Sequence, residues 1–127
     1  MTVHQFEYDS DYPGPALPVV ELGITGRAET RIISALVDSG ADATLIPANI
    51  LRAGDARKID SSWARNISGL RYRVTMYAVD LGIGSFTFPD TEVVANNHTD
   101  EIVLGRDVLN QLIVTLNGLA SVVEITR

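Results

Sequence analysis

The sequence predicts a single, mostly β domain with one short helix near its C-terminal end. Short apolar runs rich in Val, Ile and Leu recur along the chain, and Gly, Pro or Asn residues separate them, as in strands joined by tight turns. A chain of 127 residues fits one domain, and a hydrophobic content of 46% is enough for a packed core. We expect residues 1–15 to form a polar N-terminal arm and residues 16–127 to form the domain.

The first part of the domain is expected to form a hairpin and a short strand. The expected strands and a helical turn are, in order, residues 16–25, 30–37, 44–46 and 48–53. The first strand is strand-like in pattern, the second is β-branched and apolar, and Gly26 lies at the turn between them. Pro47 ends the third strand because proline has no backbone donor. Residues 54–62 are polar and are expected to be irregular.

A long hairpin is predicted between Trp63 and Leu81. Its return arm, residues 72–79, alternates between apolar and polar side chains, as a half-buried strand does. Gly69, next to Ser68, permits the positive φ that a tight turn requires, so we place the tip of the hairpin there.

The second part of the domain holds further short strands and the helix. The expected strands are residues 85–88, 91–95, 102–104, 114–116 and 121–125, and the helix covers residues 108–112. Pro89-Asp90 is expected to separate the first two of these strands. Asn117-Gly118 is a strong hairpin signal between the last two.

Composition excludes several classes of function. The net charge of −6 disfavours nucleic acid, and no basic run indicates a membrane surface. The chain has no Cys, and its two histidines, His4 and His98, are far apart, so neither a metal site nor a Ser-His-Asp triad is expected. We expect no cofactor. The N-terminus lacks the features of a signal peptide, which favours a cytoplasmic location.

The segment Asp38-Ser39-Gly40 carries the chemistry that the sequence suggests. A carboxylate follows an apolar strand and precedes a small hydroxyl residue and a glycine that allows close approach of another backbone. Taken alone, Asp-Ser-Gly is also ordinary turn chemistry. The triplet therefore needs support from the rest of the sequence.

That support is a resemblance to a known family. Leu36-Val37-Asp38-Ser39-Gly40-Ala41-Asp42 resembles the active-site segment of retroviral and retrotransposon aspartic proteases, the retropepsins. Further along, Ile102-Val103-Leu104-Gly105-Arg106-Asp107 resembles their second signature, which opens the C-terminal helix. The predicted hairpin tip lies between the two, where the family has its flap. The resemblance implies a closed β-barrel of one lobe with a flap hairpin, one short C-terminal helix and a dimeric state.

The resemblance also implies roles for individual residues. The catalytic carboxylate would be Asp38, while Ser39 would join two active-site loops and Gly40 would bind substrate backbone together with Asp42. Arg106 would pair with Asp42, and Gly105 would pack beneath the catalytic loop. The remaining expected substrate contacts are Ala41, Ala43, Ile46, Ile67, Ser68, Gly69, Leu70 and Val103.

One chain supplies only half of such a site. Aspartic protease chemistry uses two carboxyl groups, and the sequence has one Asp-Ser-Gly triplet. The resemblance therefore implies a homodimer that pairs Asp38 with its own copy and cleaves peptide or protein substrates. The chain continues past the helix into a predicted C-terminal hairpin, which we expect at the dimer interface. The alternative is a non-catalytic dimerisation or peptide-binding module with the same fold.

Overall fold

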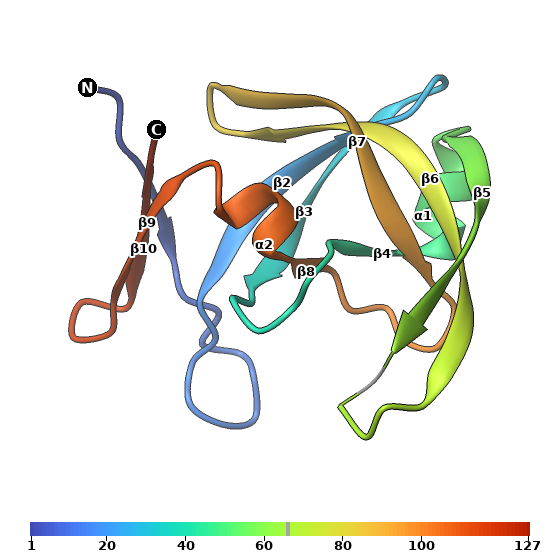
Figure 1. Cartoon of the computed structure of the whole chain (residues 1–127). Coiled ribbons are helices and arrows are strands. Elements are labelled where there is room, and N and C mark those ends of the chain that lie inside the picture. Colours follow the sequence, from blue (N-terminus) through green and yellow to red (C-terminus); the bar gives the residue numbers. More distant parts are fainter. Residues whose placement is uncertain (66) are drawn as a thin grey trace.

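The computed structural model describes residues 1–65 and 67–127 and is built mainly of strands (Figure 1). The strands are β1 (His4–Glu7), β2 (Val19–Thr25), β3 (Thr30–Val37), β4 (Leu45–Pro47), β5 (Arg57–Arg65), β6 (Arg71–Ile83), β7 (Phe86–Asn96), β8 (Val103–Leu104), β9 (Ile113–Asn117) and β10 (Val122–Thr126). The two short helices are α1 (Ala48–Ala53) and α2 (Arg106–Leu109). The predicted mostly β class is confirmed.

Seven strands form one sheet in the order β2-β3-β8-β4-β7-β6-β5. An additional antiparallel pairing between β2 and β6, with Gly23 opposite Gly82, joins the two sides of this sheet. The sheet therefore closes into a barrel, and β5 extends from β6 outside the closed ring. Closure pairs part of β2, which would otherwise be an open edge of the sheet.

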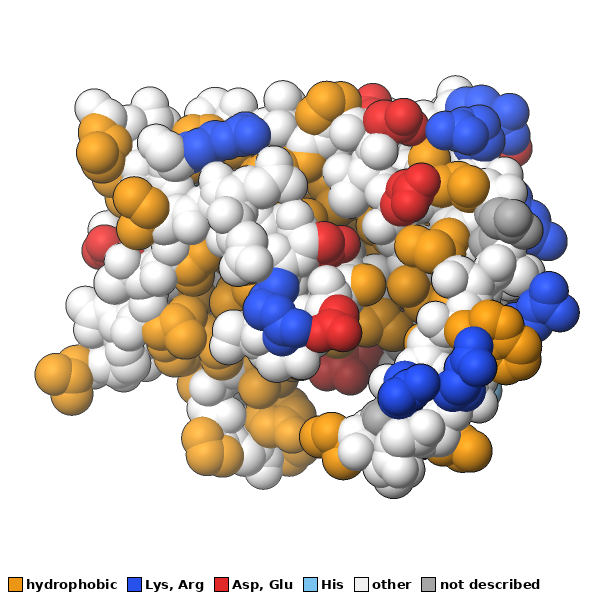
Figure 2. All heavy atoms as spheres, in the orientation of Figure 1, with side chains coloured by type: hydrophobic (Ala, Val, Ile, Leu, Met, Phe, Trp, Pro, Cys, Tyr) orange, Lys and Arg blue, Asp and Glu red, His pale blue; other side chains and the backbone are white. Residues whose placement is uncertain are grey.

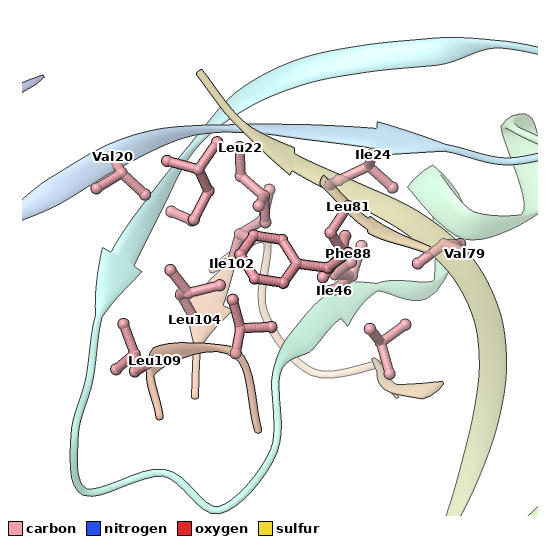
Figure 3. Close-up of a cluster of buried hydrophobic side chains, with 14 of the residues drawn as sticks. Val20, Leu22, Ile24, Ile46, Val79, Leu81, Phe88, Ile102, Leu104 and Leu109 are labelled. Carbon is pink, nitrogen blue, oxygen red and sulfur yellow. The ribbon is translucent and has the colours of Figure 1, made fainter. Parts of the chain in front are cut away.

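The core lies inside this barrel. Side chains on β2 alternate between buried and exposed positions, so that Val20, Leu22 and Ile24 point inward. Figure 3 shows them in contact with residues from β4, β6, β7 and β8, including Ile46, Phe88 and Leu104. Each fully buried aliphatic or aromatic side chain contributes about 1.5–3 kcal/mol, so this cluster provides the main stabilisation of the barrel.

A second, three-stranded sheet joins the two ends of the chain in the order β1-β10-β9 (Figure 1). The turn after Asn117 connects β9 to β10, as the sequence predicts. The strand β1 was not expected, because the polar segment before residue 16 lacks a clear apolar alternation. It pairs with β10, with Phe6 opposite the fully buried Val123. This pairing supplies the apolar contact that makes residues 4–7 a strand.

Other boundaries also differ from the predictions. The strand β5 begins at Arg57, within the stretch that we expected to be irregular, because it pairs with β6 around a register shift. Pro89-Asp90 does not divide β7 into two strands: Asp90 adopts a positive φ of 49° at a bulge, and the pairing with β6 continues on both sides. The helix α2 has four residues, about one turn instead of two.

Candidate active site

The loop that carries Asp38 is fixed by the strand arrangement around β8. Parallel β3 and antiparallel β4 flank β8, so residues 38–44 must pass from one side of β8 to the other. The backbone N–H of Asp38 donates to the carbonyl of Leu104 at 3.1 Å, which continues the β3–β8 ladder into the loop. The position of Asp38 is therefore set by the barrel itself.

The Asp38 carboxylate is held at one oxygen. Its Oδ1 accepts the backbone N–H of Gly40 at 2.9 Å, and the N–H of Ala41 donates to the Asp38 carbonyl at 3.2 Å. A side chain at Gly40 would place its Cβ only 3.1 Å from Oδ1, so glycine suits this tight turn. Within residues 1–65 and 67–127, Oδ2 accepts no hydrogen bond, so one carboxylate oxygen remains available.

Arg106, at the start of α2, braces the loop from below. Its Nη1 donates to the carbonyl of Ser39 at 2.7 Å, and its Nη2 pairs with Asp42 Oδ1. Its backbone N–H donates to the carbonyl of Ala41 at 2.9 Å. The pairing of Arg106 with Asp42 that the resemblance implied is thus present, and three bonds join one residue to the loop.

A second brace uses Thr44 and Asp107. Thr44 is fully buried, and its N–H and hydroxyl donate to the Asp107 carboxylate at 3.0 and 2.8 Å. The hydroxyl also accepts the N–H of Gly105 at 3.1 Å. We expected no role of this kind for Asp107. Two sequence features could have predicted this contact: a carboxylate directly after Arg106, and a threonine at the end of the loop.

Gly105 leaves no space for a side chain. A Cβ at this position would lie 2.5 Å from the carbonyl carbon of Ala43 and 3.0 Å from the N of Thr44. Both neighbours are backbone atoms, so they cannot rotate away. The residue packs directly beneath the loop, as the resemblance implied.

A cleft of about 780 Å³ lies between this loop and the β5–β6 hairpin. The loop contributes the four residues Gly40, Ala41, Asp42 and Ala43. The other lining residues are Leu45, Ser62, Trp63, Ala64, Arg65, Ile67, Tyr72, Val74, Met76 and Val94. Figures 1 and 2 show the loop and the hairpin on opposite sides of this region. The lining is largely apolar, with polar backbone at one wall.

The structure separates the expected substrate contacts into two groups. Ile67 lines the cleft, but Ser68, Gly69 and Leu70 at the exposed tip do not line it in this single chain. Ile46 is fully buried in the core. Val103 is 9% exposed and does not line the cleft, but it lies opposite Leu45 in the sheet and therefore shares the face of Leu45.

Strand geometry explains this difference. Neighbouring residues in a strand point to opposite faces, so Leu45 faces the cleft while Ile46 enters the core. Tyr72, Val74 and Met76 also line the cleft, and their alternation along β6 was the signal that could have identified them. The expectation for Ile46 is therefore corrected in favour of Leu45.

The structure also bears on metal binding and on membrane insertion. Among residues 1–65 and 67–127, no group of three or more His, Cys, Asp or Glu side chains is placed to hold a metal ion. No helix in the described part of the chain is long and apolar enough to span a bilayer.

The fold is similar to solved aspartic proteases. EIAV protease, solved with the inhibitor HBY-793, superposes with a TM-score of 0.62 at 18% identity, covering 79% of this chain and 91% of that one. A retropepsin-like aspartic protease from Rickettsia conorii superposes with a TM-score of 0.63 at 12% identity, covering 98% and 91%. Because that alignment spans nearly the whole chain, it includes the terminal three-stranded sheet.

The sequence comparison agrees with the structural one. No curated protein sequence matches this chain. A family model described as "gag-polyprotein putative aspartyl protease" matches residues 24–111, which include the Asp38 loop, the β5–β6 hairpin and α2. The match covers more than half of the chain and includes both sequence signatures. The chain therefore belongs to the gag-polyprotein aspartyl protease family.

Proposed function

We propose that this chain is an aspartic endopeptidase that acts as a homodimer, with one Asp38 from each copy in a shared site. The observation that carries the proposal is the Asp38 carboxylate, which is fixed at Oδ1 by the N–H of Gly40, a residue that lines an apolar cleft. The cleft has the size and the apolar lining of a ligand site. Its loop wall presents backbone groups that an extended peptide can pair with.

The chemistry follows from two carboxyl groups around one water. One Asp38 carboxylate takes a proton from the water while the oxygen of the water attacks the carbonyl carbon of the scissile bond. The other Asp38, protonated, donates to the carbonyl oxygen as charge develops there. Collapse of the tetrahedral intermediate breaks the C–N bond, and the amine leaves with a proton from a carboxyl group. Ser39 would link the two loops across the twofold axis.

The exposed edge of the terminal sheet supports the proposal that a second copy of the chain binds there. Leu116 lies on β9, on the same face as the fully buried Val123 opposite it, yet Leu116 is 53% exposed. The sheet ends at β9, so nothing in the described part of the chain covers this edge. Pairing of β9 with its own copy would bury Leu116 and satisfy the free backbone groups of the strand.

Peptide digestion tests the proposal. The purified protein is incubated with a proteome-derived peptide library across a range of pH, and the products are identified by mass spectrometry. We expect cuts between apolar residues, because the cleft lining is largely apolar, and we expect activity to fall at both pH extremes, because the two carboxyl groups must share one proton.

Asp38→Asn is the decisive variant, and Asp11→Asn at an exposed site is its matched control. Asparagine keeps an oxygen that can accept the Gly40 N–H, so the loop should stay folded while turnover is lost. A pepstatin-type inhibitor should raise the Tm of the parent dimer. Cleavage by Asp38→Asn at the rate of the parent would refute the mechanism. No cleavage by either protein would refute the proposed activity and favour a peptide-binding module.

A further inference from the structure

Positive charge is concentrated on the β5–β6 hairpin. The chain has ten Lys and Arg residues against sixteen acidic ones, yet half of the basic residues lie between positions 57 and 73. They are Arg57, Lys58, Arg65, Arg71 and Arg73. Figure 2 shows Lys and Arg side chains gathered over this hairpin. An acidic protein therefore carries a local basic surface beside its cleft.

Strand pairing places three of these arginines around the only tryptophan of the chain. Trp63 lies opposite Arg73, and Arg65 lies opposite Arg71, so the four side chains share one face of the hairpin. The Arg71 guanidinium lies over the Trp63 ring, 5.0 Å from its centroid, which confirms that they share this face. We call Trp63, Arg65, Arg71 and Arg73 the outer hairpin face.

This face adjoins the cleft. Tyr72 and Val74 alternate with Arg71 and Arg73 along β6 and line the cleft. On β5, Trp63 and Arg65 also border the cleft. A peptide that leaves the cleft on this side would therefore pass the outer hairpin face.

The arrangement is unfavourable without a partner. Arg65 and Arg71 are like charges in directly opposed positions, which destabilises a strand pair. The ion pairs within the described residues involve Arg27, Arg31, Arg57 and Arg106, so the three arginines of the outer hairpin face take part in none of them. Trp63 is also 59% exposed. Three exposed guanidinium groups around an exposed indole are suited to bind carboxylates and chain atoms of a peptide.

We propose that the outer hairpin face binds an acidic segment of the protein substrate, next to the residues that occupy the cleft. This inference rests on the proposed endopeptidase function. A protein segment is favoured over nucleic acid because the net charge of −6 opposes a polyanion, whereas a short acidic segment meets only the local positive surface.

The first test compares two peptides with the same cleavable core, one extended by four Glu and one by four Gln. We expect the parent protein to cleave the Glu peptide with a KM about tenfold lower at low salt, and this preference to disappear in 1 M NaCl. The double variant Arg71→Gln, Arg73→Gln should lose the preference but keep its kcat/KM for the Gln peptide. The double variant Arg31→Gln, Arg52→Gln removes equal charge elsewhere and should keep the preference.

The second test does not depend on cleavage. The fluorescence of Trp63 is followed while the same peptides are added to the Asp38→Asn protein. A salt-sensitive change with the Glu peptide alone supports the inference, even if no peptide is cleaved and the proposed function fails. Equal cleavage of both peptides with no change in Trp63 fluorescence would overturn it, as would tighter binding of an oligothymidylate than of the Glu peptide.

Discussion

Replacing Thr44 with Val should separate the effect of the hydrogen bonds that brace the Asp38 loop from the effect of the packing around them. Valine has nearly the same shape as threonine, so no cavity forms at this fully buried position. The substitution removes the 2.8 Å bond to the Asp107 carboxylate and leaves the Gly105 N–H without its 3.1 Å acceptor.

The magnitude follows from these two losses. A hydrogen bond to a charged group contributes about 1.5–3 kcal/mol, and a buried donor left unsatisfied costs about 1–3 kcal/mol. We therefore expect the free energy of unfolding to fall by about 3 kcal/mol. For a chain of this size, that corresponds to a decrease in Tm of roughly 10 °C. The loop that precedes Thr44 should also move, which would lower kcat/KM by about tenfold or more.

Differential scanning calorimetry and peptide cleavage measure the two effects. Thr87→Val, at an exposed position on β7, is the matched control and should change Tm by less than about 2 °C. Thr44→Ser keeps the hydroxyl and should lose only about 1 kcal/mol for the missing methyl group. If Thr44→Ser destabilised the protein as much as Thr44→Val, packing rather than hydrogen bonding would hold the loop, and the reasoning would be wrong.

Three further predictions concern the loop and the dimer. Arg106→Lys keeps the charge, but lysine cannot reproduce the guanidinium fork that binds both the Ser39 carbonyl and Asp42. We therefore expect kcat/KM to fall about tenfold in cleavage assays, with little change in the secondary structure measured by circular dichroism. Leu116→Asp should shift the protein to monomers in sedimentation analysis and abolish activity, whereas Ile32→Asp, at an exposed position on β3, should stay dimeric. Gly105→Ala should lower Tm by more than 10 °C or prevent folding, because its Cβ meets backbone at 2.5 Å; a normal Tm would show that the loop can move aside.

Local sequence patterns predicted a strand or turn correctly where the residues of that segment alone favour the structure. The β-branched run at residues 30–37 predicted β3 with its observed bounds, and the turn residues placed the hairpin after Asn117. The start of β5 and the whole of β1 were missed because their partners determine them. His4 illustrates this point: its Nε2 accepts the N–H of Ser85 at 3.0 Å, and its ring stacks edge-on against Phe86, far along the chain.

The candidate site shows the same division. The residue types around Asp38 were recognisable in sequence, because close turns and carboxylate chemistry require particular residues at short spacing. Leu45 faces the cleft and Ile46 enters the core because of the way β4 is oriented in the barrel. The strand β4 has only three residues, too few for an alternating pattern to predict which side chain points inward. Asp107 was missed because its partner, Thr44, lies 63 residues away in the chain.

The short segment from Gly105 to Asn117 connects the Asp38 loop to the proposed dimer interface. Its first residues hold the loop: Arg106 bonds to Ser39 and Asp42, while Asp107 bonds to Thr44. The strand β9 begins four residues after α2 ends, and the exposed Leu116 lies on that strand. A second copy that pairs with β9 would therefore restrain the chain next to the residues that position Asp38. In the proposed dimer, assembly would supply the second carboxylate and also stabilise the braces that hold the first.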